Sequence, residues 1–246
     1  MSGNNQPIDA SDRDAKESRA TSSTSSSFHG KHGALLRVQP RPVPCPLPIV
    51  LGSSSSRRRA VMEELGWQFS TASPDIDEKA IRDADPRKMC AAIARAKARA
   101  LAGRLDKHAV LVTADQVCLF DAEDGGGEVI REKPESVQEA EQFLRSYSCR
   151  TVKTLNTLCV TNLETGQVAE GSHQSIVSWK EIPSGVVGAV VARGLVMSSA
   201  GGFSLEDPDL GPLVDNIEGS VDSVFGMPVD LLCTLIERAM VGAGQL

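Results

Sequence analysis

The sequence is organised around the stretch Pro48-Ile49-Val50-Leu51-Gly52-Ser53-Ser54-Ser55-Ser56-Arg57-Arg58-Arg59-Ala60. Its short apolar run predicts a buried β-strand, and its arginines begin a predicted α-helix that continues to Leu65. Backbone N–H groups at such a helix start lack partners, and the helix dipole favours negative charge there. Serine hydroxyls add donors, and arginine adds a forked charge suited to phosphate oxygens. We therefore expect Ser53, Ser55, Arg57 and Arg58 to bind a phosphorylated ligand.

The same stretch also has a simpler explanation. Serine is one of the preferred residues at the N-terminal end of a helix, and arginines commonly coat a solvated helix face. On this stretch alone the two explanations are about equally well supported, so the choice between them depends on the rest of the chain.

The composition narrows the class of protein. The chain has 246 residues, enough for one large domain or two small ones, and its 41% hydrophobic and 24% charged content is ordinary for a soluble globular protein. A net charge of −6 and only 4% aromatic residues argue against a nucleic-acid-binding surface, which needs basic residues and stacking aromatics. No apolar run approaches the roughly 20 residues that a membrane-spanning helix needs. We expect neither a nucleic acid nor a membrane as a partner.

Residues 1–47 differ in composition from the rest of the chain. The first 31 residues are rich in Ser, Thr, Asp and Arg, and the segment from Arg37 to Pro48 is rich in proline. Such a segment buries too little apolar surface to offset the entropy lost on ordering. We predict a disordered tail at 1–47 and one domain at 48–246. A transit peptide is the alternative, which the acidic residues of the segment disfavour.

The six cysteines are scattered singly, without a C-x-x-C pair or the spacing of a metal site. They are typical of free thiols in a reducing compartment. Together with the lack of a clear targeting signal, this pattern predicts a cytoplasmic protein.

Asp115 stands out within the strongest strand signal of the chain, the nearly continuous apolar run from Ala109 to Phe120. Such a run predicts a central strand that is buried on both faces. A carboxylate there is costly unless it is paired, bound to a metal or exposed to a cleft. Asp115 is therefore a candidate functional residue, and a hydrogen-bonded structural aspartate is the alternative.

Further elements follow from periodicity and turn residues. Helices are predicted at about 87–102, 136–147 and 229–240, the second with a capping box formed by Ser136 and Glu139. Strands are predicted at about 67–70, 128–131, 154–162, 172–179 and 213–217. The type of segment 184–193 is open, because its Val and Gly content weakens the helix prediction. Segments 198–203 and 218–228 are predicted to be loops.

Cations and carboxylates from different predicted elements form one set: the Ser/Arg stretch with Glu78, Lys97, Asp115 and Lys133. Phosphoryl chemistry needs such a set, because cations offset charge on phosphate oxygens while carboxylates hold a divalent metal or accept a proton from water. The sequence contains neither the G-x-x-x-x-G-K-[ST] motif of P-loop enzymes nor a G-x-G-x-x-G motif after a strand.

Nine short motifs, taken in chain order over residues 48–240, resemble the Maf family of nucleoside triphosphate pyrophosphatases. The sequences Arg131–Pro134 and Asp222–Pro228 are similar to those of members from plants and algae. The motifs are Leu51–Arg59, Asp75–Glu78, Ala96–Ala98, Ala114–Val117, Glu132–Pro134, Ser148–Thr151, Ala200–Phe203, Ile217–Ser220 and Val224–Pro228. The resemblance implies an α/β fold like that of inosine triphosphatase, with a mixed twisted sheet, flanking helices and two lobes around a central cleft. It also implies hydrolysis of a nucleoside triphosphate to a monophosphate and diphosphate, and a homodimer.

The resemblance also implies roles for individual residues. Asp115 corresponds to the proton acceptor, and Glu78 with Asp115 would hold Mg²⁺ or Mn²⁺. Arg58, Lys97 and Lys133 would bind the phosphates of the substrate. A metal and cations at the phosphates would draw charge from the α-phosphate while Asp115 activates water.

Two departures from the family pattern affect these expectations. The family has Glu where this sequence has Ala96, so one carboxylate that supports the metal is missing. The family also has Gly where this sequence has Cys149. Because Glu78 and Asp115 are present, we still expect an active enzyme.

At three positions of the family, the residue type varies with the substrate, and these positions correspond to Arg57, Gln116 and Glu206. Gln116 and Glu206 resemble the branch that acts on 7-methyl-GTP, and a carboxylate can accept hydrogen bonds from the N–H edge of a guanine. Arg57 resembles the dTTP/UTP branch. We favour 7-methyl-GTP, with dTTP or UTP as the alternative. A non-catalytic nucleotide-binding regulator of cell division, built on the same fold, is the alternative from another class.

Overall fold

The computed structural model describes Leu36, residues 38–122 and residues 126–241. Most of the predicted tail therefore lies outside the described residues. Along the chain the elements, with η for 3-10 helices, are β1 (Ile49–Leu51), α1 (Ser56–Glu64), β2 (Phe69–Thr71), η1 (Glu78–Ala80), α2 (Pro86–Ala102), β3 (Val110–Asp121), β4 (Glu128–Arg131), α3 (Val137–Tyr147), β5 (Thr151–Asn162), β6 (Val168–Trp179), α4 (Ser184–Ala192), η2 (Leu195–Ser198), η3 (Ala200–Gly202), η4 (Gly211–Leu213), β7 (Val214–Glu218), α5 (Val221–Val224) and α6 (Val229–Met240).

The strands in the described part of the chain form one seven-stranded mixed sheet, which confirms the predicted fold class. Its order is β2-β1-β3-β5-β6-β7, and β4 pairs with the second half of β3. β1 is parallel to both β2 and β3, whereas the remaining pairs are antiparallel. β3 therefore runs through the middle of the sheet, as its apolar run predicts.

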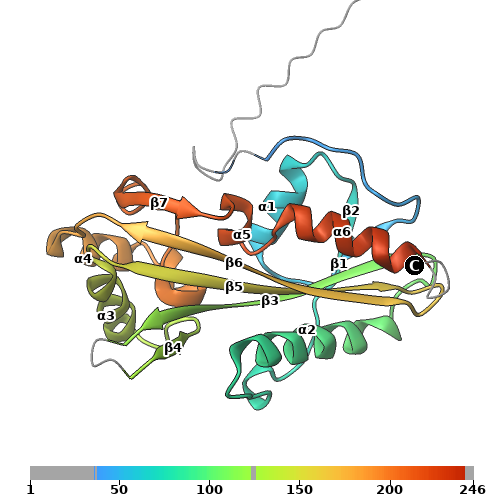
Figure 1. Cartoon of the computed structure of the whole chain (residues 1–246), viewed down its shortest axis with the longest axis horizontal. Coiled ribbons are helices and arrows are strands. Elements are labelled where there is room, and N and C mark those ends of the chain that lie inside the picture. Colours follow the sequence, from blue (N-terminus) through green and yellow to red (C-terminus); the bar gives the residue numbers. More distant parts are fainter. Residues whose placement is uncertain (1–35, 37, 123–125, 242–246) are drawn as a thin grey trace, which may run out of the picture. The chain divides into compact units, whose positions relative to one another are not determined.

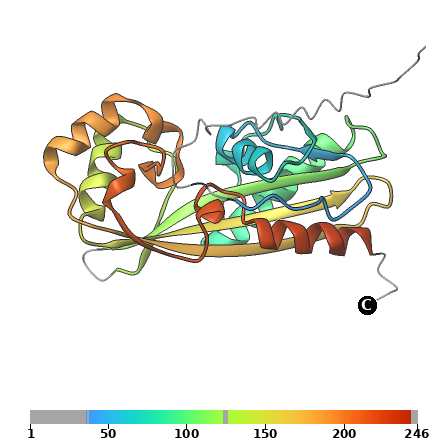
Figure 2. The ribbon, with the colours of Figure 1, turned by 90° about the horizontal axis from the view of Figure 1, so that it is seen from above.

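Helices cover both faces of this sheet, and the alternation of side chains along the strands shows which helix covers which face. Leu51 and Val112 belong to the same buried cluster as residues of α1 and α6. Val50 and Leu111, their neighbours in sequence, belong to a second cluster with residues of α2. Figure 1 and Figure 2 both show α3 and α4 beside one end of the long strands, with α1 and α6 beside the other end.

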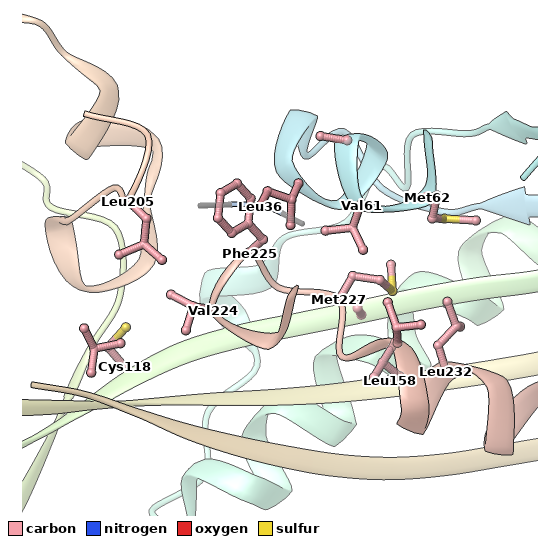
Figure 3. Close-up of a cluster of buried hydrophobic side chains, with 14 of the residues drawn as sticks. Leu36, Val61, Met62, Cys118, Leu158, Leu205, Val224, Phe225, Met227 and Leu232 are labelled. Atoms are coloured by element: carbon pink, nitrogen blue, oxygen red, sulfur yellow. The ribbon is translucent and has the colours of Figure 1, made fainter. Parts of the chain in front are cut away.

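The described part of the predicted tail packs against the core. Leu36 and Leu47 are 6% and 7% exposed, and Figure 3 draws Leu36 in the same apolar cluster as Val61 and Phe225. The Trp67 indole N–H donates to the backbone carbonyl of Arg41 at 2.8 Å. Composition alone missed this packing because a few apolar residues among many prolines give no periodic signal. Residues 1–35 and 37 lie outside the described residues, and their disorder stays a prediction.

The structure shows the conformation of the three segments for which the sequence predicted a loop or left the type open. Segment 184–193 forms α4, in which Val187, Val190 and Val191 are buried. Segment 198–203 contains the last residue of η2 and the whole of η3, and segment 218–228 contains the short helix α5. The predicted cap of α3 is present, with the Glu139 N–H donating to Ser136 Oγ at 3.1 Å. The Glu139 carboxylate accepts from the backbone N–H of Glu135 rather than from Ser136 itself.

Candidate active site

The loop between β1 and α1 is built as the sequence predicts. A Cβ on Gly52 would lie 2.6 Å from Thr113 Cγ2, so only glycine lets the end of β1 approach β3 this closely. Ser55 is the N-cap residue of α1 and accepts a hydrogen bond from the backbone N–H of Arg58. Ser53 Oγ accepts from the backbone N–H of Ser55 at 3.2 Å. These bonds fix the loop at the N-terminus of α1, where an anion is favoured.

Arg58 is not a solvated surface arginine, because it is only 8% exposed. Its Nε donates to the Gly226 carbonyl at 3.0 Å, and its Nη1 donates to the Ala114 carbonyl at 3.0 Å and to Ser53 Oγ at 3.3 Å. Burial lowers the pKa of the guanidinium below its ordinary value, and the negative charges of Asp115 and Glu78 oppose that shift. The explanation that arginines merely coat a helix face therefore fails for Arg58.

Lys97 brings the two predicted carboxylates together. Its Nζ lies 3.0 Å from Asp115 Oδ1 and 2.9 Å from Glu78 Oε2, and it also donates to the Ala114 carbonyl at 3.3 Å. The Lys97 and Asp115 side chains are 7% and 10% exposed, and the Glu78 side chain is 48% exposed. Lys97 comes from α2, Asp115 from β3 and Glu78 from η1. The ammonium group of Lys97 offsets the negative charge of the carboxylates, which would otherwise be costly to bury.

These residues line one cleft of about 630 Å³, a size typical of small-molecule sites. Lys133, which follows β4, lines the same cleft. Among the described residues no hydrogen bond or ion pair occupies its ammonium group. Ser198 of η2 and Ala200 of η3 also line the cleft, so the short helices that follow α4 in the chain contribute to it. Of the predicted site residues, it is lined by Ser53, Ser55, Arg57, Arg58, Glu78, Lys97, Asp115, Gln116 and Lys133.

Glu206 contacts this set through an ion pair rather than by lining the cleft. Arg57 Nε lies 3.0 Å from Glu206 Oε2, and both side chains are mostly buried. Arg57 Nη2 also donates to the Leu195 carbonyl and to Ser204 Oγ, at 3.3 and 3.5 Å. A small pocket beside the cleft is lined by Arg57, Gln116 and Phe225, among others, and its volume of about 20 Å³ has room for roughly one water.

Gln116 is oriented by a buried polar network that sequence reasoning missed. Its Nε2 donates to the carbonyls of Val224 and Ser223 at 3.1 and 3.4 Å. Asn156, opposite Gln116 on β5, is fully buried and donates to the Ser223 carbonyl at 2.8 Å. His173 Nδ1 lies 2.8 Å from Ser223 Oγ. Only the interruption of an apolar strand by Asn156 hints at this network in the sequence.

The departures from the family pattern have local effects. Cys149 is the only described residue other than glycine with a positive φ, 56°. This is the left-handed region that favours glycine. The backbone N–H of Cys149 donates to the Lys180 carbonyl at 3.2 Å, so the turn is kept. Ala96 lies beside Lys97 on α2, where it supplies no carboxylate.

The residues present fit a divalent metal ion most of whose coordination positions are filled by water and by the phosphates of a bound nucleotide. No group of three or more metal-binding side chains occurs in residues 36–241 as far as they are described. Two carboxylate oxygens, from Glu78 and Asp115, converge within 3.0 Å of one Lys97 nitrogen. Mg²⁺ commonly takes one or two carboxylates and fills its remaining positions with water and substrate phosphates. The donor set therefore suits a metal–phosphate complex better than an ion bound by protein alone.

The six cysteines are all free thiols. None of the described helices is long and apolar enough to cross a membrane.

Comparisons with known proteins agree with the site. The family model described as Maf-like protein matches residues 48–239. A 7-methyl-GTP pyrophosphatase of Dictyostelium discoideum is 37% identical over 198 residues, covering 78% of this chain and 96% of its own length. A dTTP/UTP pyrophosphatase of Chlamydia trachomatis is 33% identical over 189 residues, covering 76% and 92%. A nucleoside-triphosphatase / dITP/XTP pyrophosphatase structure from Mycobacterium abscessus covers 56% of this chain and 75% of its own at 15% identity and a TM-score of 0.34, too low to support an argument.

Proposed function

The chain belongs to the Maf-like protein family, and from this premise we propose that it hydrolyses a nucleoside triphosphate to a nucleoside monophosphate and diphosphate. The observation that carries the proposal is the convergence of Glu78 and Asp115 on Lys97 inside a cleft that Arg58 and Lys133 also line. A protein that only binds a nucleotide would need the cations but not the carboxylate of Asp115. Hydrolysis requires in addition a base that accepts a proton from water, and the buried carboxylate of Asp115 can serve as that base.

In this reaction the oxygen of a water molecule forms a bond to the α-phosphorus while the anhydride bond to the β-phosphate breaks. Asp115 accepts a proton from the attacking water, and diphosphate leaves with the electrons of the broken bond. Arg58 and Lys133 bind the phosphate oxygens and offset their charge. Lys97 holds the carboxylates of Asp115 and Glu78 in place and adds a third cation to the cleft.

Glu78 and Asp115 would hold the divalent metal, Mg²⁺ or Mn²⁺. When bound, the metal supplies Lewis-acid charge at the phosphate oxygens. Glu78 is the more exposed of the two carboxylates, so it is placed to receive an ion that arrives with the substrate. Asp115 is the more buried of the two, and we assign to it the further role of accepting the proton of the attacking water.

The substrate we favour is 7-methyl-GTP, and the Arg57–Glu206 ion pair supports that choice. A 7-methylguanine base carries a positive charge, so it can replace the guanidinium of Arg57 as the partner of Glu206 without leaving the carboxylate uncompensated. An uncharged pyrimidine cannot make that exchange. Glu206 lines neither the cleft nor the small pocket, so Arg57 or the segment around Glu206 must move for a base in the cleft to contact this carboxylate.

The test is diphosphate release from 7-methyl-GTP, GTP, dTTP, UTP and CTP, first with Mg²⁺ and then with Mn²⁺, with chelator as the control. We expect release from 7-methyl-GTP above the others and none with chelator. Preference for dTTP or UTP would keep the reaction and reverse the choice of substrate. Nucleotide binding without any release would overturn the proposal in favour of a non-catalytic regulator.

A further inference from the structure

Two ion pairs join the same two segments across one wall of the cleft. Lys79 Nζ lies 2.5 Å from Glu135 Oε1, and Arg82 Nη2 lies 3.2 Å from Glu132 Oε2. A second nitrogen of Arg82, Nη1, lies 3.5 Å from the other carboxylate oxygen of Glu132. Each pair links the segment 76–82, which follows β2, to the segment 132–135 between β4 and α3. We refer to the two pairs together as the clamp.

The clamp lies beside the residues that the proposed reaction uses. Glu78 precedes Lys79 in η1, and Lys133 lies between Glu132 and Glu135 in the sequence. Lys79, Glu132 and Glu135 also line the cleft. The position of a metal-binding carboxylate relative to a phosphate-binding lysine thus depends on how these two segments are held together.

Side-chain ion pairs, rather than main-chain hydrogen bonds, join the described residues of the two segments. Within residues 38–122 and 126–241, no main-chain hydrogen bond joins 76–82 to 132–135. The segment 76–82 is held by local turn bonds, such as the Ile81 N–H to the Glu78 carbonyl, and by the Lys97–Glu78 ion pair. Segment 132–135 is attached elsewhere, through the Gly201 N–H that donates to the Glu132 carbonyl.

The clamp is poorly placed to stabilise the fold. The side chains of Lys79 and Glu135 are 74% and 72% exposed, and those of Arg82 and Glu132 are 45% and 48% exposed. Ion pairs this exposed contribute little to the free energy of unfolding. The hydrogen bond between these two side chains, and after it their charge attraction, raises the pKa of Lys79 and lowers that of Glu135, as expected for a pair that favours both charged forms. A role in geometry fits these observations better than a role in stability.

We propose that Lys79, Arg82, Glu132 and Glu135 are positioning residues, which hold Glu78 and Lys133 at the separation that the metal–triphosphate complex requires. This inference rests on the proposed function. Its alternative is that Lys79 acts alone, as one more cation that contacts the phosphates.

Charge reversal separates these two roles, because they predict opposite effects of Glu135→Lys. If only the charge of the cleft matters, an added lysine attracts the polyanionic substrate and lowers its KM. If the clamp matters, the variant breaks an ion pair, so KM rises and kcat falls despite the favourable charge. We expect Glu135→Lys to lower kcat/KM about tenfold, within the range of couplings between contacting residues.

The exchanged pair, Lys79→Glu with Glu135→Lys, is the decisive variant. It restores the clamp with reversed polarity, so we expect kcat/KM to return to within about threefold of wild type, as strong coupling requires. The same design applies to Arg82→Glu with Glu132→Arg. The exposed pair Glu141 and Arg145 on α3 supplies the matched control, whose exchange should leave KM unchanged. Failure of both exchanges to rescue their single variants would overturn the proposal.

Hydrogen exchange of the nucleotide-free protein keeps this test separate from the proposed function. Glu135→Lys should speed amide exchange in both 76–82 and 132–135, and the exchanged pair should reverse it. This result is required even if the wild type cleaves none of the nucleotides offered. Unchanged exchange in either segment would show that the ion pairs do not hold them.

Discussion

Lys97 Nζ and Asp115 Oδ1 lie 3.0 Å apart, and both side chains are almost entirely buried between α2 and β3. The same nitrogen lies 2.9 Å from Glu78 Oε2, on the more exposed side of the cleft. One lysine therefore sets the separation of the two carboxylates to which we assign the base and the metal. Because buried ion pairs gain little over apolar packing, we assign this pair a role in the proposed chemistry rather than in stabilising the core.

Replacing Asp115 by Asn should abolish turnover and preserve the fold. The amide is nearly the same size, and its oxygen can still accept from Lys97, but it cannot take a proton from water. We expect kcat to fall by about 10²- to 10⁴-fold, the usual contribution of a general base. Diphosphate release measures the loss, and circular dichroism with a melting curve is the control. Near-normal turnover in a folded variant would rule Asp115 out as the base.

Replacing Glu206 by Gln should change substrate preference. The amide leaves Arg57 without its carboxylate partner and offers no negative charge to a cationic base. We expect kcat/KM for 7-methyl-GTP to fall about tenfold relative to that for dTTP, as for loss of a charged hydrogen bond. The ratio of the two specificity constants is the measurement. A ratio equal to that of wild type would mean that Glu206 does not contact the base.

Gly226 is a site where a single methyl group should disturb Arg58, the arginine to which we assign phosphate binding. Its φ is 92°, and a Cβ there would lie 3.0 Å from Gln116 Oε1 and 3.3 Å from Arg58 Nε. We expect Gly226→Ala to cost about 1–3 kcal/mol of stability from backbone strain and to raise KM. Urea unfolding and steady-state kinetics provide the two readouts.

Gly188 is the matched control for that variant, because it lies exposed in α4 and an added methyl group would have nothing within 4 Å. Gly188→Ala should stabilise the protein by about 0.5–1 kcal/mol through helix propensity and leave KM unchanged. If the two substitutions had the same effect, the close approach at Gly226 would be irrelevant.

Removing residues 1–47 should destabilise the protein more than removing residues 1–35. The longer deletion takes away Leu36 and Leu47 from the core, the acceptor of the Trp67 indole and the ion pair between Arg41 and Asp230. Loss of a buried leucine alone costs about 2–5 kcal/mol. Thermal melting of the two truncated proteins compares them directly. Equal melting temperatures would show that residues 36–47 do not contribute to the core.

How much the sequence predicted depended on whether the signal was local. The long apolar run predicted the central strand β3, and the capping pair Ser136 and Glu139 predicted the start of α3, because each pattern is contained in one segment. The serine loop at 53–55, between β1 and α1, was recognisable for the same reason. Family membership and the mixed α/β fold, inferred from nine short motifs, are confirmed.

The remaining features depend on contacts between distant segments. Asn156 reads as an ordinary interruption of a strand, and its partner Ser223 lies 67 residues away. The Arg57–Glu206 pair joins residues 149 apart, and neither position alone indicates that it is paired. Such pairings follow from strand order and loop paths, so the structure was needed to find them. The assigned roles of the site residues remain predictions.

The most direct test of the central claim is hydrolysis of 7-methyl-GTP in water enriched in ¹⁸O, followed by mass spectrometry of both products. Attack of water on the α-phosphorus predicts one ¹⁸O atom in the nucleoside monophosphate and none in the diphosphate. Label in the diphosphate, or release of orthophosphate with a nucleoside diphosphate, would contradict the account, since the water would then have attacked a different phosphorus.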